Sequence, residues 1–383
     1  MTDPGTQPEQ PWTTSYLAAL AGPAQVLAFM PQARTFRSQT VRQAVRLRRG
    51  GDRTRLVLSN EFGAEPLVID QITLTNARTG HTTQALHAGD TRWEIPAGKT
   101  ATSDPAALSV RPGDKLIIDC FVAGRTAPGS YLHSAQSTAV AAPGNQLGQP
   151  QLTGAERFAS LYWISQVLVD EPASGPVIIT FGDSITRGDA TSIDMDQRYP
   201  DHLQRRLLAA GLDNAVVLNA GLGGNRVLRP MAGPSMTDRY ARDVLDITEA
   251  THVIILGGIN DIGLPLTLGE PRPAAKEITD GLLALARRAH DRGIQPILAT
   301  IPPILASRYE NFLADGNEET RRAVNDAITS QQDWPFADSS AALAAPEDPV
   351  RLNPAHDSGD GIHPADSGAR ALAAAIDLTF FTQ

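Results

Sequence analysis

The second half of the chain alternates between short apolar runs and segments of helical spacing, beginning near residue 173. Five segments have the composition of buried strands, at residues 177–180, 215–218, 252–256, 294–300 and 336–337. Segments with the apolar period of a helix lie at residues 199–210, 236–248, 276–292, 318–331 and 367–378. Strands that alternate with helices predict a parallel sheet covered on both faces, and right-handed crossovers then give a doubly wound α/β/α layer.

The first half, from about residue 34 to 167, instead has the period of β-strands. Alternation is clearest at residues 40–47 and 53–58, and Gly50-Gly51-Asp52 between them predicts a hairpin. Further short strands are expected at residues 66–75, 91–94 and 114–122, and a long loop at residues 141–154. This spacing predicts an antiparallel sandwich or jelly roll. We therefore expect two domains, residues 1–172 and 173–383.

Composition limits the class of protein. Apolar residues make up 42% of the chain and charged residues 20%, which is typical of a globular protein. The net charge of −9 argues against a nucleic-acid partner. No apolar run approaches the roughly 20 residues that span a bilayer. Residues 1–5 also lack the basic and apolar regions of a signal peptide. The sequence as written predicts a cytoplasmic protein, and secretion would require a leader that has been removed.

The single cysteine and the scattered histidines argue against disulfide and metal chemistry. Cys120 lies in the strand expected at residues 114–122, where we expect a buried, inert thiol. The eight histidines show no H-x-x-x-H spacing, and no cysteine-rich motif accompanies them. The sequence therefore predicts no metal site.

Three expected strands end in polar or glycine-rich segments. Ser184 follows the first strand, Gly224 the second and Asn260 the third. Because ligands bind beyond the carboxyl ends of parallel strands, we expect the three loops to meet at one edge of the sheet. Ser184 there is a candidate nucleophile, and the alternative is a serine that caps the next helix. Thr186 replaces the second glycine of a G-x-S-x-G elbow, and no phosphate-binding G-x-x-x-x-G-K-[ST] run is present.

His363 is the best candidate for a general base. Asp360 precedes it by three residues, so one turn can place its carboxylate against the imidazole and fix the tautomer. The alternative is that Asp360 only shapes a surface turn. His356 is the nearest competitor, but it has no acid one turn before it.

Gly224 and Asn260 are candidate hydrogen-bond donors to an oxyanion. Without a side chain, the backbone near Gly224 can approach a ligand and present its N–H. A dinucleotide-binding loop beginning at Gly221 is the alternative, but its pattern breaks at Arg226. The Asn260 side chain supplies a second donor, or else it forms a turn after its strand.

Residues beside these positions are candidates for substrate contact: Asp183, Asn225, Arg226 and Asp261. Asp261 is also suited to supporting its loop. We expect Arg187, Arg226 and Arg229 to be solvated surface charges, with attraction of a polar or anionic acyl group as the alternative.

Together the four segments resemble the SGNH subgroup of the GDSL esterases and lipases. The matching blocks are Phe181-Gly182-Asp183-Ser184-Ile185-Thr186, Gly224, Gly258-Ile259-Asn260-Asp261 and Asp360-Gly361-Ile362-His363-Pro364. The resemblance runs from about residue 173 to the C-terminus. It implies a three-layer, flavodoxin-like α/β/α fold without a metal or organic cofactor.

The resemblance also implies roles for the matched residues. Ser184 would be the nucleophile, His363 the base and then the acid, and Asp360 the residue that orients the imidazole. The oxyanion hole would combine the backbone N–H groups of Ser184 and Gly224 with the side chain of Asn260.

The N-terminal half is similar to the β-sandwich of some two-domain SGNH carbohydrate esterases. The sequence therefore predicts a serine esterase that hydrolyses short acyl esters, such as O-acetyl groups on a carbohydrate or glycosylated metabolite, through an acyl-enzyme. A lipase or lysophospholipase and a non-catalytic carbohydrate-binding protein are the alternatives. The expected partner is a small-molecule or carbohydrate ester, and the sequence does not predict an oligomeric state. The sandwich either covers one flank of the catalytic layer or contributes a loop, residues 126–131 or 142–148, to the pocket.

Overall fold

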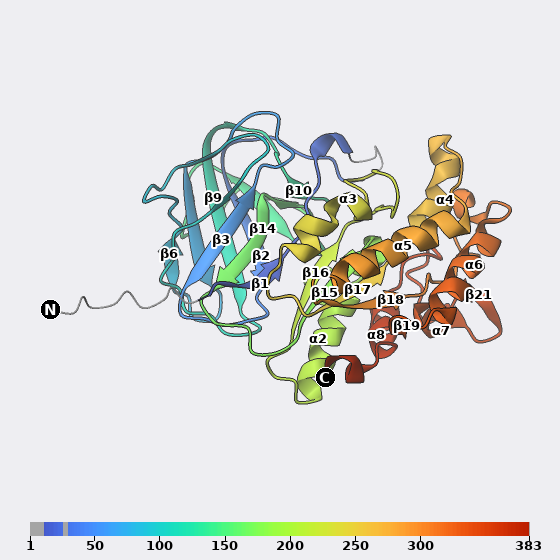
Figure 1. The fold of residues 1–383 in the computed structure, drawn as a ribbon. Helices are drawn as coiled ribbons and strands as arrows, with labels where there is room; N and C mark the ends of the chain where they lie inside the picture. Colours follow the sequence, from blue (N-terminus) through green and yellow to red (C-terminus); the bar gives the residue numbers. More distant parts are fainter. Residues whose placement is uncertain (1–10, 26–29, 383) are drawn as a thin grey trace.

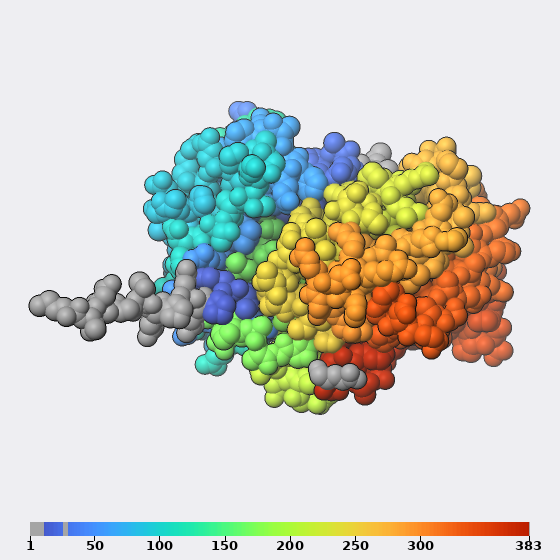
Figure 2. All heavy atoms as spheres, viewed as in Figure 1, coloured from blue at the N-terminus to red at the C-terminus, as the bar shows by residue number. Residues whose placement is uncertain are grey.

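The computed structural model describes residues 11–25 and 30–382. The N-terminal half and the C-terminal half form two adjoining masses, blue to cyan and yellow to red in Figures 1 and 2. The prediction that residues 1–5 lack the features of a signal peptide concerns residues that lie outside the described ones. Among the residues described, none of the helices combines the length and apolar character that crossing a membrane requires.

A parallel sheet of five strands forms the centre of the C-terminal half, in the order β16-β15-β17-β18-β19. Its strands are β15 (Val177–Gly182), β16 (Val216–Gly221), β17 (His252–Leu256), β18 (Gln295–Ala299) and β19 (Phe336–Ala337). In chain order this is the 2-1-3-4-5 arrangement of flavodoxin-like doubly wound sheets. The predicted fold class is confirmed.

Helices cover both faces of this sheet (Figure 1). The α-helices are α1 (Ser184–Arg187), α2 (Tyr199–Ala209), α3 (Met236–Tyr240), α4 (Ile259–Leu268), α5 (Ala275–His290), α6 (Asn317–Ser330), α7 (Ser339–Leu343) and α8 (Asp366–Ala374). Helix α8 packs on α2 and α7, whereas α5 packs on α3 and α6. Shorter elements are the 3₁₀ turns η1 (Pro23–Gln25), η3 (Glu310–Leu313) and η4 (Leu378–Phe381), the π-helical turn η2 (Ala241–Leu245) and the hairpin of β20 (Ala344–Ala345) and β21 (Asp348–Leu352).

Two helical regions differ from the prediction. The helix expected at residues 236–248 is α3 followed by the π turn η2, in which the Asp246 N–H donates to the Ala241 carbonyl at 2.8 Å. Helix α4 was not predicted, because Gly257 and Gly258 precede it and Pro265 lies inside it. Its side chains Ile259, Ile262 and Leu264 are buried, whereas Leu266 is exposed, so packing of one face stabilises a helix that local propensity disfavours.

The N-terminal half contains two antiparallel sheets. The six-stranded sheet has the order β12-β11-β2-β9-β5-β6 and the four-stranded sheet β1-β14-β3-β8. The strands of the larger sheet are β2 (Phe36–Arg46), β5 (Gln71–Asn76), β6 (Thr82–Gln84), β9 (Lys115–Thr126), β11 (Ala139–Pro143) and β12 (Glu156–Phe158). Those of the smaller sheet are β1 (Thr13–Leu17), β3 (Thr54–Ser59), β8 (Thr100–Thr102) and β14 (Ile164–Val169). Two short pairs complete this half: β4 (Leu67–Ile69) with β7 (Trp93–Ile95), and β10 (Tyr131–Leu132) with β13 (Leu161–Tyr162).

The two sheets share one apolar core, as a sandwich requires. Val41 and Cys120 of the larger sheet and Leu56 and Val167 of the smaller sheet belong to the same buried cluster. The predicted sandwich is therefore confirmed. Cys120 is fully buried as expected, and burial raises the pKa of its thiol far above the usual value.

The hairpin predicted at Gly50-Gly51-Asp52 is wrong. Strands β2 and β3 belong to different sheets, so the segment between them crosses from one sheet to the other. Distant partners hold this crossing: the N–H of Arg49 donates to Ser15 Oγ at 3.0 Å, and that of Gly51 to the Val110 carbonyl at 3.0 Å. The loop predicted at residues 141–154 also begins later, because β11 continues to Pro143.

The predicted domain boundary falls between β14 and β15 and remains a prediction. Each half contributes a side chain to the other's core: Leu17 belongs to the cluster around the parallel sheet, and Leu222 to that of the sandwich. The two halves therefore share a packed seam.

Candidate functional site

The three predicted loops meet at the carboxyl edge of the parallel sheet. In the pairing of the strands, Gly182 of β15 lies opposite Gly221 of β16 and Leu256 of β17. Ser184 follows β15 as the first residue of α1. Asp183 caps this helix, because its Oδ1 accepts a hydrogen bond from the Ile185 N–H at 3.0 Å. The alternative that Ser184 itself is the capping residue is wrong, and its hydroxyl is left for another partner.

That partner is His363. Ser184 Oγ lies 2.8 Å from His363 Nε2, and His363 Nδ1 lies 2.7 Å from Asp360 Oδ2. When Nδ1 carries a proton and donates it to the carboxylate, Nε2 can accept a hydrogen bond from the serine hydroxyl. The structure thus brings together a hydroxyl, an imidazole and a carboxylate in one hydrogen-bonded chain.

Asp360 both shapes its turn and orients the imidazole. Its Oδ1 accepts hydrogen bonds from the backbone N–H groups of Ile362 and His363 at 2.9 and 2.8 Å, and its Oδ2 bonds the ring. Gly361 has a φ of +73°, and a Cβ there would lie 1.9 Å from the Ala306 carbonyl oxygen. Only glycine fits this turn, so the turn geometry itself presents the carboxylate to the ring.

Charges around the imidazole control its protonation. Burial alone would lower the pKa of His363, but the hydrogen bond that its ring donates to Asp360 and the negative charges of Asp189, Asp360 and Asp183 raise it above the usual value. Burial opposes ionisation of Asp360 as well, yet its bonds to His363 and to the backbone hold its pKa far below the usual value. The carboxylate is therefore ionised wherever the imidazole can act as a base.

Asp183 is a second, differently placed acid. It is 1% exposed, and among the described residues its Oδ2 has no hydrogen-bond partner. Burial raises the pKa of Asp183 to about 7, against a lowering by the Ile185 N–H and His363. Its structural role is to cap α1 directly before Ser184.

Gly224 lies in the loop after β16, and Asn260 lies in the first turn of α4, which follows β17. Gly224 has a φ of +70°, and its N–H has no acceptor among the residues described here. Asn260 is the second residue of α4, and its Nδ2 donates to the Asn225 carbonyl at 3.0 Å. That bond ties the loop after β16 to the loop after β17 and leaves one hydrogen of the Asn260 amide for another acceptor.

The flanking side chains support the loops. Asn225 is fully buried; its Oδ1 accepts from Arg239 Nε at 2.8 Å and its Nδ2 donates to the Pro234 carbonyl at 2.7 Å. Asp261 accepts hydrogen bonds from two backbone N–H groups of residues 227 and 228, at 2.7 and 3.1 Å. Burial raises the pKa of Asp261 to about 6. Substrate contact by these residues stays a prediction.

The expectation that the three arginines are solvated is wrong for two of them. Arg187 and Arg226 are 4% and 3% exposed, and each is paired with a partly exposed carboxylate, Asp189 and Glu270 respectively. Arg226 Nη1 lies 2.7 Å from Glu270 Oε2. Arg229 alone has an exposed side chain, and it lies 3.4 Å from the same carboxylate.

Three residues close to the site were not predicted. The Tyr309 hydroxyl donates to Asp360 Oδ2 at 3.4 Å. Asp189 follows Ser184 by one helical turn and pairs with Arg187, which in turn contacts His133 of the sandwich. The predicted loop at residues 126–131 ends just before His133. The sequence carries no signal for this contact, because 54 residues separate His133 from Arg187.

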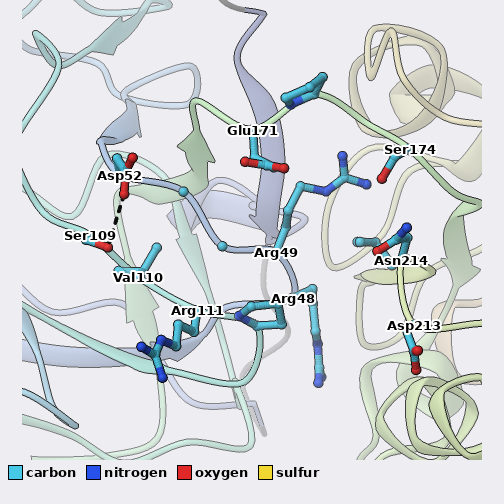
Figure 3. Close-up of a pocket in the computed structure, with 15 residues that line it drawn as sticks. Arg48, Arg49, Asp52, Ser109, Val110, Arg111, Glu171, Ser174, Asp213 and Asn214 are labelled. Carbon is cyan, nitrogen blue, oxygen red and sulfur yellow. Dashed lines mark hydrogen bonds between the residues drawn. The ribbon is translucent and has the colours of Figure 1, made fainter.

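A cavity of about 460 Å³ lies at the opposite edge of the sheet, where β15 and β16 begin (Figure 3). Residues from both halves line it, including Arg49, Arg111, Glu171 and Asn214. Its lining contains none of the predicted site residues. The two terminal nitrogens of Arg49 are buried and have no hydrogen-bond partner among the described residues. The hydrogen-bonded chain and this cavity are separate features.

Residues 180–371 match the model of the GDSL-like lipase/acylhydrolase family, which is half of the chain. The chain belongs to this family. The matched region begins within β15 and ends within α8, so it includes Ser184, Gly224, Asn260, Asp360 and His363. The family resemblance found in the sequence is thereby confirmed.

A curated relative shares part of the sequence. The uncharacterized lipoprotein YqeF of Bacillus subtilis (strain 168) is 32% identical over 139 residues, which are 36% of this chain and 52% of the relative. The chain therefore spans about half the length of the curated relative it matches.

Solved structures are similar to about half of the chain. The aryl esterase of M. smegmatis is 19% identical, with a TM-score of 0.42. The match covers 52% of this chain and 95% of the esterase. Est24, a carbohydrate acetylesterase from Sinorhizobium meliloti, is 18% identical with a TM-score of 0.42 and the same coverage. A catalytic mutant of Axe2, an acetylxylan esterase from Geobacillus stearothermophilus, is 23% identical with a TM-score of 0.41, and 53% of this chain covers 93% of it.

Proposed function

We propose that this protein is a serine esterase that hydrolyses short acyl esters through an acyl-enzyme. The observation that carries the proposal is the chain of two hydrogen bonds, 2.8 Å from Ser184 Oγ to His363 Nε2 and 2.7 Å from His363 Nδ1 to Asp360 Oδ2. Membership of an acylhydrolase family supports the same reaction class.

In the proposed mechanism, His363 Nε2 takes the proton of Ser184 Oγ as the oxygen attacks the ester carbonyl carbon. The resulting imidazolium donates its proton to the departing alcohol, which leaves Ser184 acylated. Water then attacks the acyl carbonyl, with His363 again as base, and the serine is released with the carboxylic acid. Asp360 stays ionised throughout and stabilises each imidazolium.

Two tetrahedral intermediates carry negative charge on the former carbonyl oxygen. The backbone N–H groups of Ser184 and Gly224 and the free amide hydrogen of Asn260 are the proposed donors to that oxygen. Fixed donors of this kind stabilise the transition state more than the substrate, since the charge develops only as the reaction proceeds.

Apolar side chains pack beside Gly224, which is one of the proposed oxyanion donors. A Cβ placed on Gly224 would lie 2.9 Å from Met30 Cε, 3.1 Å from Ala232 Cβ and 3.3 Å from Met231 Cε. This side of the loop therefore packs against apolar side chains. Acetylated carbohydrates are the proposed natural substrates, because a β-sandwich precedes the family region in this chain, as in some two-domain SGNH carbohydrate esterases.

Replacement of the nucleophile tests the proposal. Ser184→Ala should lower kcat for p-nitrophenyl acetate by about 10⁶-fold, since the members of a triad act as a unit. Ser174→Ala, an exposed serine at the opposite edge of the sheet, is the matched control and should keep full activity. An organophosphonate should label Ser184 of the wild-type protein, as peptide mass spectrometry would detect. Retained activity in Ser184→Ala would falsify the assignment.

A lipase is the second candidate, because the family description includes lipases. The two candidates differ in how kcat/KM depends on acyl length. For p-nitrophenyl acetate, butyrate and octanoate, a steep fall supports the short-chain esterase, and a rise supports the lipase. Acetylated xylo-oligosaccharides in the same series test the carbohydrate substrate. Sugar binding without turnover or labelling would instead support a non-catalytic binding protein.

Export of the chain is a separate proposal. The curated relative is named a lipoprotein, and a leader or anchor on the native protein would place this esterase outside the cytoplasm. Fractionation of the native cells, with activity measured in each fraction, tests this location.

A further inference from the structure

The segment between α1 and α2, residues 188–198, lies along the seam between the two halves. From the sandwich, Thr138 donates to both carboxylate oxygens of Asp194 at 2.6 Å, through its N–H and its hydroxyl. Arg46 of β2 lies 2.6 Å from Asp196. On the other side, the Ser192 N–H donates to Asp366 of α8 at 2.7 Å. Both halves of the molecule therefore hold this segment in place.

Arg187 makes a buried contact across this seam. Its Nη1 donates to the His133 carbonyl oxygen at 2.5 Å and lies 2.9 Å from His133 Nδ1. Its Nε and Nη2 donate to the two oxygens of Asp189 at 2.7 and 2.5 Å. A Cβ on Gly223 would lie 2.2 Å from Arg187 Nη2, so this glycine makes room for the guanidinium. Both planar edges of the guanidinium are thus used, one toward each half.

Asp189 is fixed directly behind the serine. Its backbone N–H donates to the Ser184 carbonyl at 3.0 Å, and Gly188 between them adopts a φ of +100°. The next residue, Ala190, has a φ of +67°, a conformation that costs a non-glycine residue on the order of 1–2 kcal/mol. Such strain persists only where the surrounding contacts over-determine the backbone. Here those contacts are the arginine fork and the bonds to the sandwich.

We propose that His133, Arg187 and Asp189 form a clamp through which the sandwich helps to position the catalytic centre. The clamp holds the Asp189 carboxylate where its charge stabilises the protonated form of His363. This inference rests on the proposed esterase function. His133 and Arg187 are positioning residues, because they act through Asp189 and do not touch the serine or imidazole in the described contacts.

The charged and titratable groups around the imidazole determine how the clamp affects the pKa of His363. Burial lowers the pKa of His363, whereas the Asp360 hydrogen bond, Asp189, Asp360 and Asp183 raise it. The Tyr309 hydroxyl donates to Asp360 Oδ2, the oxygen that also bonds His363, and burial together with Asp360 and Asp189 raises the pKa of Tyr309, so it stays an uncharged phenol. Arg187 is the nearby cation, held in the fork to Asp189.

His133 adds no opposing charge to this cluster. Burial and the neighbouring Arg187 lower the pKa of His133 to about 3, so its ring is neutral at physiological pH. A neutral ring can accept a hydrogen bond from the guanidinium, whereas a protonated ring would repel it. The charges of the clamp are therefore those of the Arg187–Asp189 pair, and the neutral ring adds no positive charge that would oppose the effect of Asp189 on His363.

Asp189→Asn tests the clamp in the full-length protein. The amide oxygen can still accept from Arg187, but the negative charge is gone. Without that charge the pKa of His363 falls, so the acidic limb of the kcat/KM profile should move to lower pH, and kcat on the plateau should fall. Asp194→Asn is the matched control, since it removes a seam carboxylate of the same segment that bonds Thr138. Asp189→Glu, which keeps the charge, should retain the wild-type profile.

A second readout does not depend on turnover. Proton NMR titration of His363 should give a lower pKa in Asp189→Asn than in the wild type and in Asp194→Asn. An unmoved His363 pKa, or the same shift in both asparagine variants, overturns the clamp. Failure of the esterase function is a different result: wild-type protein that neither hydrolyses esters nor reacts with an organophosphonate would refute that function while the titration still reports on Asp189.

Discussion

The buried His133 and the partly buried His363, on opposite sides of the seam between the two halves, show how neighbouring charge assigns a role. Burial lowers the pKa of both rings. His363 in the C-terminal half lies among carboxylates, which raise its pKa above the usual value. His133 in the sandwich lies against Arg187, and its pKa falls to about 3. One ring is suited to exchange a proton near neutral pH, and the other is suited only to accept a hydrogen bond.

Replacing each histidine by alanine should give the largest difference in activity between the two roles. His363→Ala should lower kcat by about 10⁶-fold, because a triad without its base works no better than one without its nucleophile. His133→Ala should cause a far smaller loss, since the carbonyl that accepts from Arg187 belongs to the backbone and remains. Steady-state kinetics with p-nitrophenyl acetate measure both. Equal losses in the two variants would contradict the distinction.

Asp360, the carboxylate partner of His363, can be replaced without disrupting the turn that Asp360 shapes. Asp360→Asn should lower kcat by about 10⁴-fold, because an amide favours the wrong tautomer and does not stabilise the imidazolium. Its oxygen can still accept from the backbone N–H groups that build the turn. Asp357→Asn, whose carboxylate accepts from Gly359 and Gly361 in the same loop, is the control and should stay active. Near-normal activity in Asp360→Asn would mean that another carboxylate orients the ring.

The proposed oxyanion donors should give a smaller effect. Asn260→Ala should lower kcat by about 10²–10³-fold with little change in KM, because the donated hydrogen bond strengthens only in the transition state. Asn311→Ala is the control, since that side chain supports the same helix through the Gly263 carbonyl at 2.8 Å without a place in the site. A loss of thermal stability with unchanged kcat in Asn260→Ala would assign this residue a structural role.

The smallest effect concerns stability. The folded pKa of His133 is depressed from 6.5 to about 3, so between these values the unfolded chain binds a proton that the native protein does not. Acidification from pH 6.5 to 5 should therefore cost about 2 kcal/mol through this ring. The raised pKa of His363 acts in the opposite sense: its contribution is present below pH 6.5 and is lost as the pH rises through the folded value.

Urea unfolding at pH 6.5 and 5 measures that contribution. His133→Asn, which keeps an acceptor near Arg187 but does not titrate, should lose less stability on acidification than the wild type. An identical loss in both proteins would show that His133 is protonated in the fold or does not govern this pH range.

Local periodicity and short-range motifs explain why much of the fold and site could be predicted. The apolar runs at residues 177–180, 215–218 and 252–256 are strands of the parallel sheet, since buried strands carry their signal within a few residues. Their ends lie at one edge because parallel topology leaves no other arrangement. Asp360 and His363 could be paired because three residues separate them in one turn.

Other predictions failed where the deciding partner is distant in the chain. Gly50 and Gly51 have the composition of a hairpin, but Ser15 and Val110 bond the segment and direct it to the other sheet. Helix α4 forms against the core although its glycines and proline disfavour it. Arg187 was expected in solvent, and His133 together with Asp189 buries it.

The sequence by itself determined the two kinds of periodicity, the family blocks and the residue types at the end of each strand, because these are properties of neighbouring residues. Only the tertiary structure decided which charges surround His133 and His363. That outcome depends on side chains from both halves meeting at one seam, and electrostatic energy depends on distance in space, not on separation along the chain.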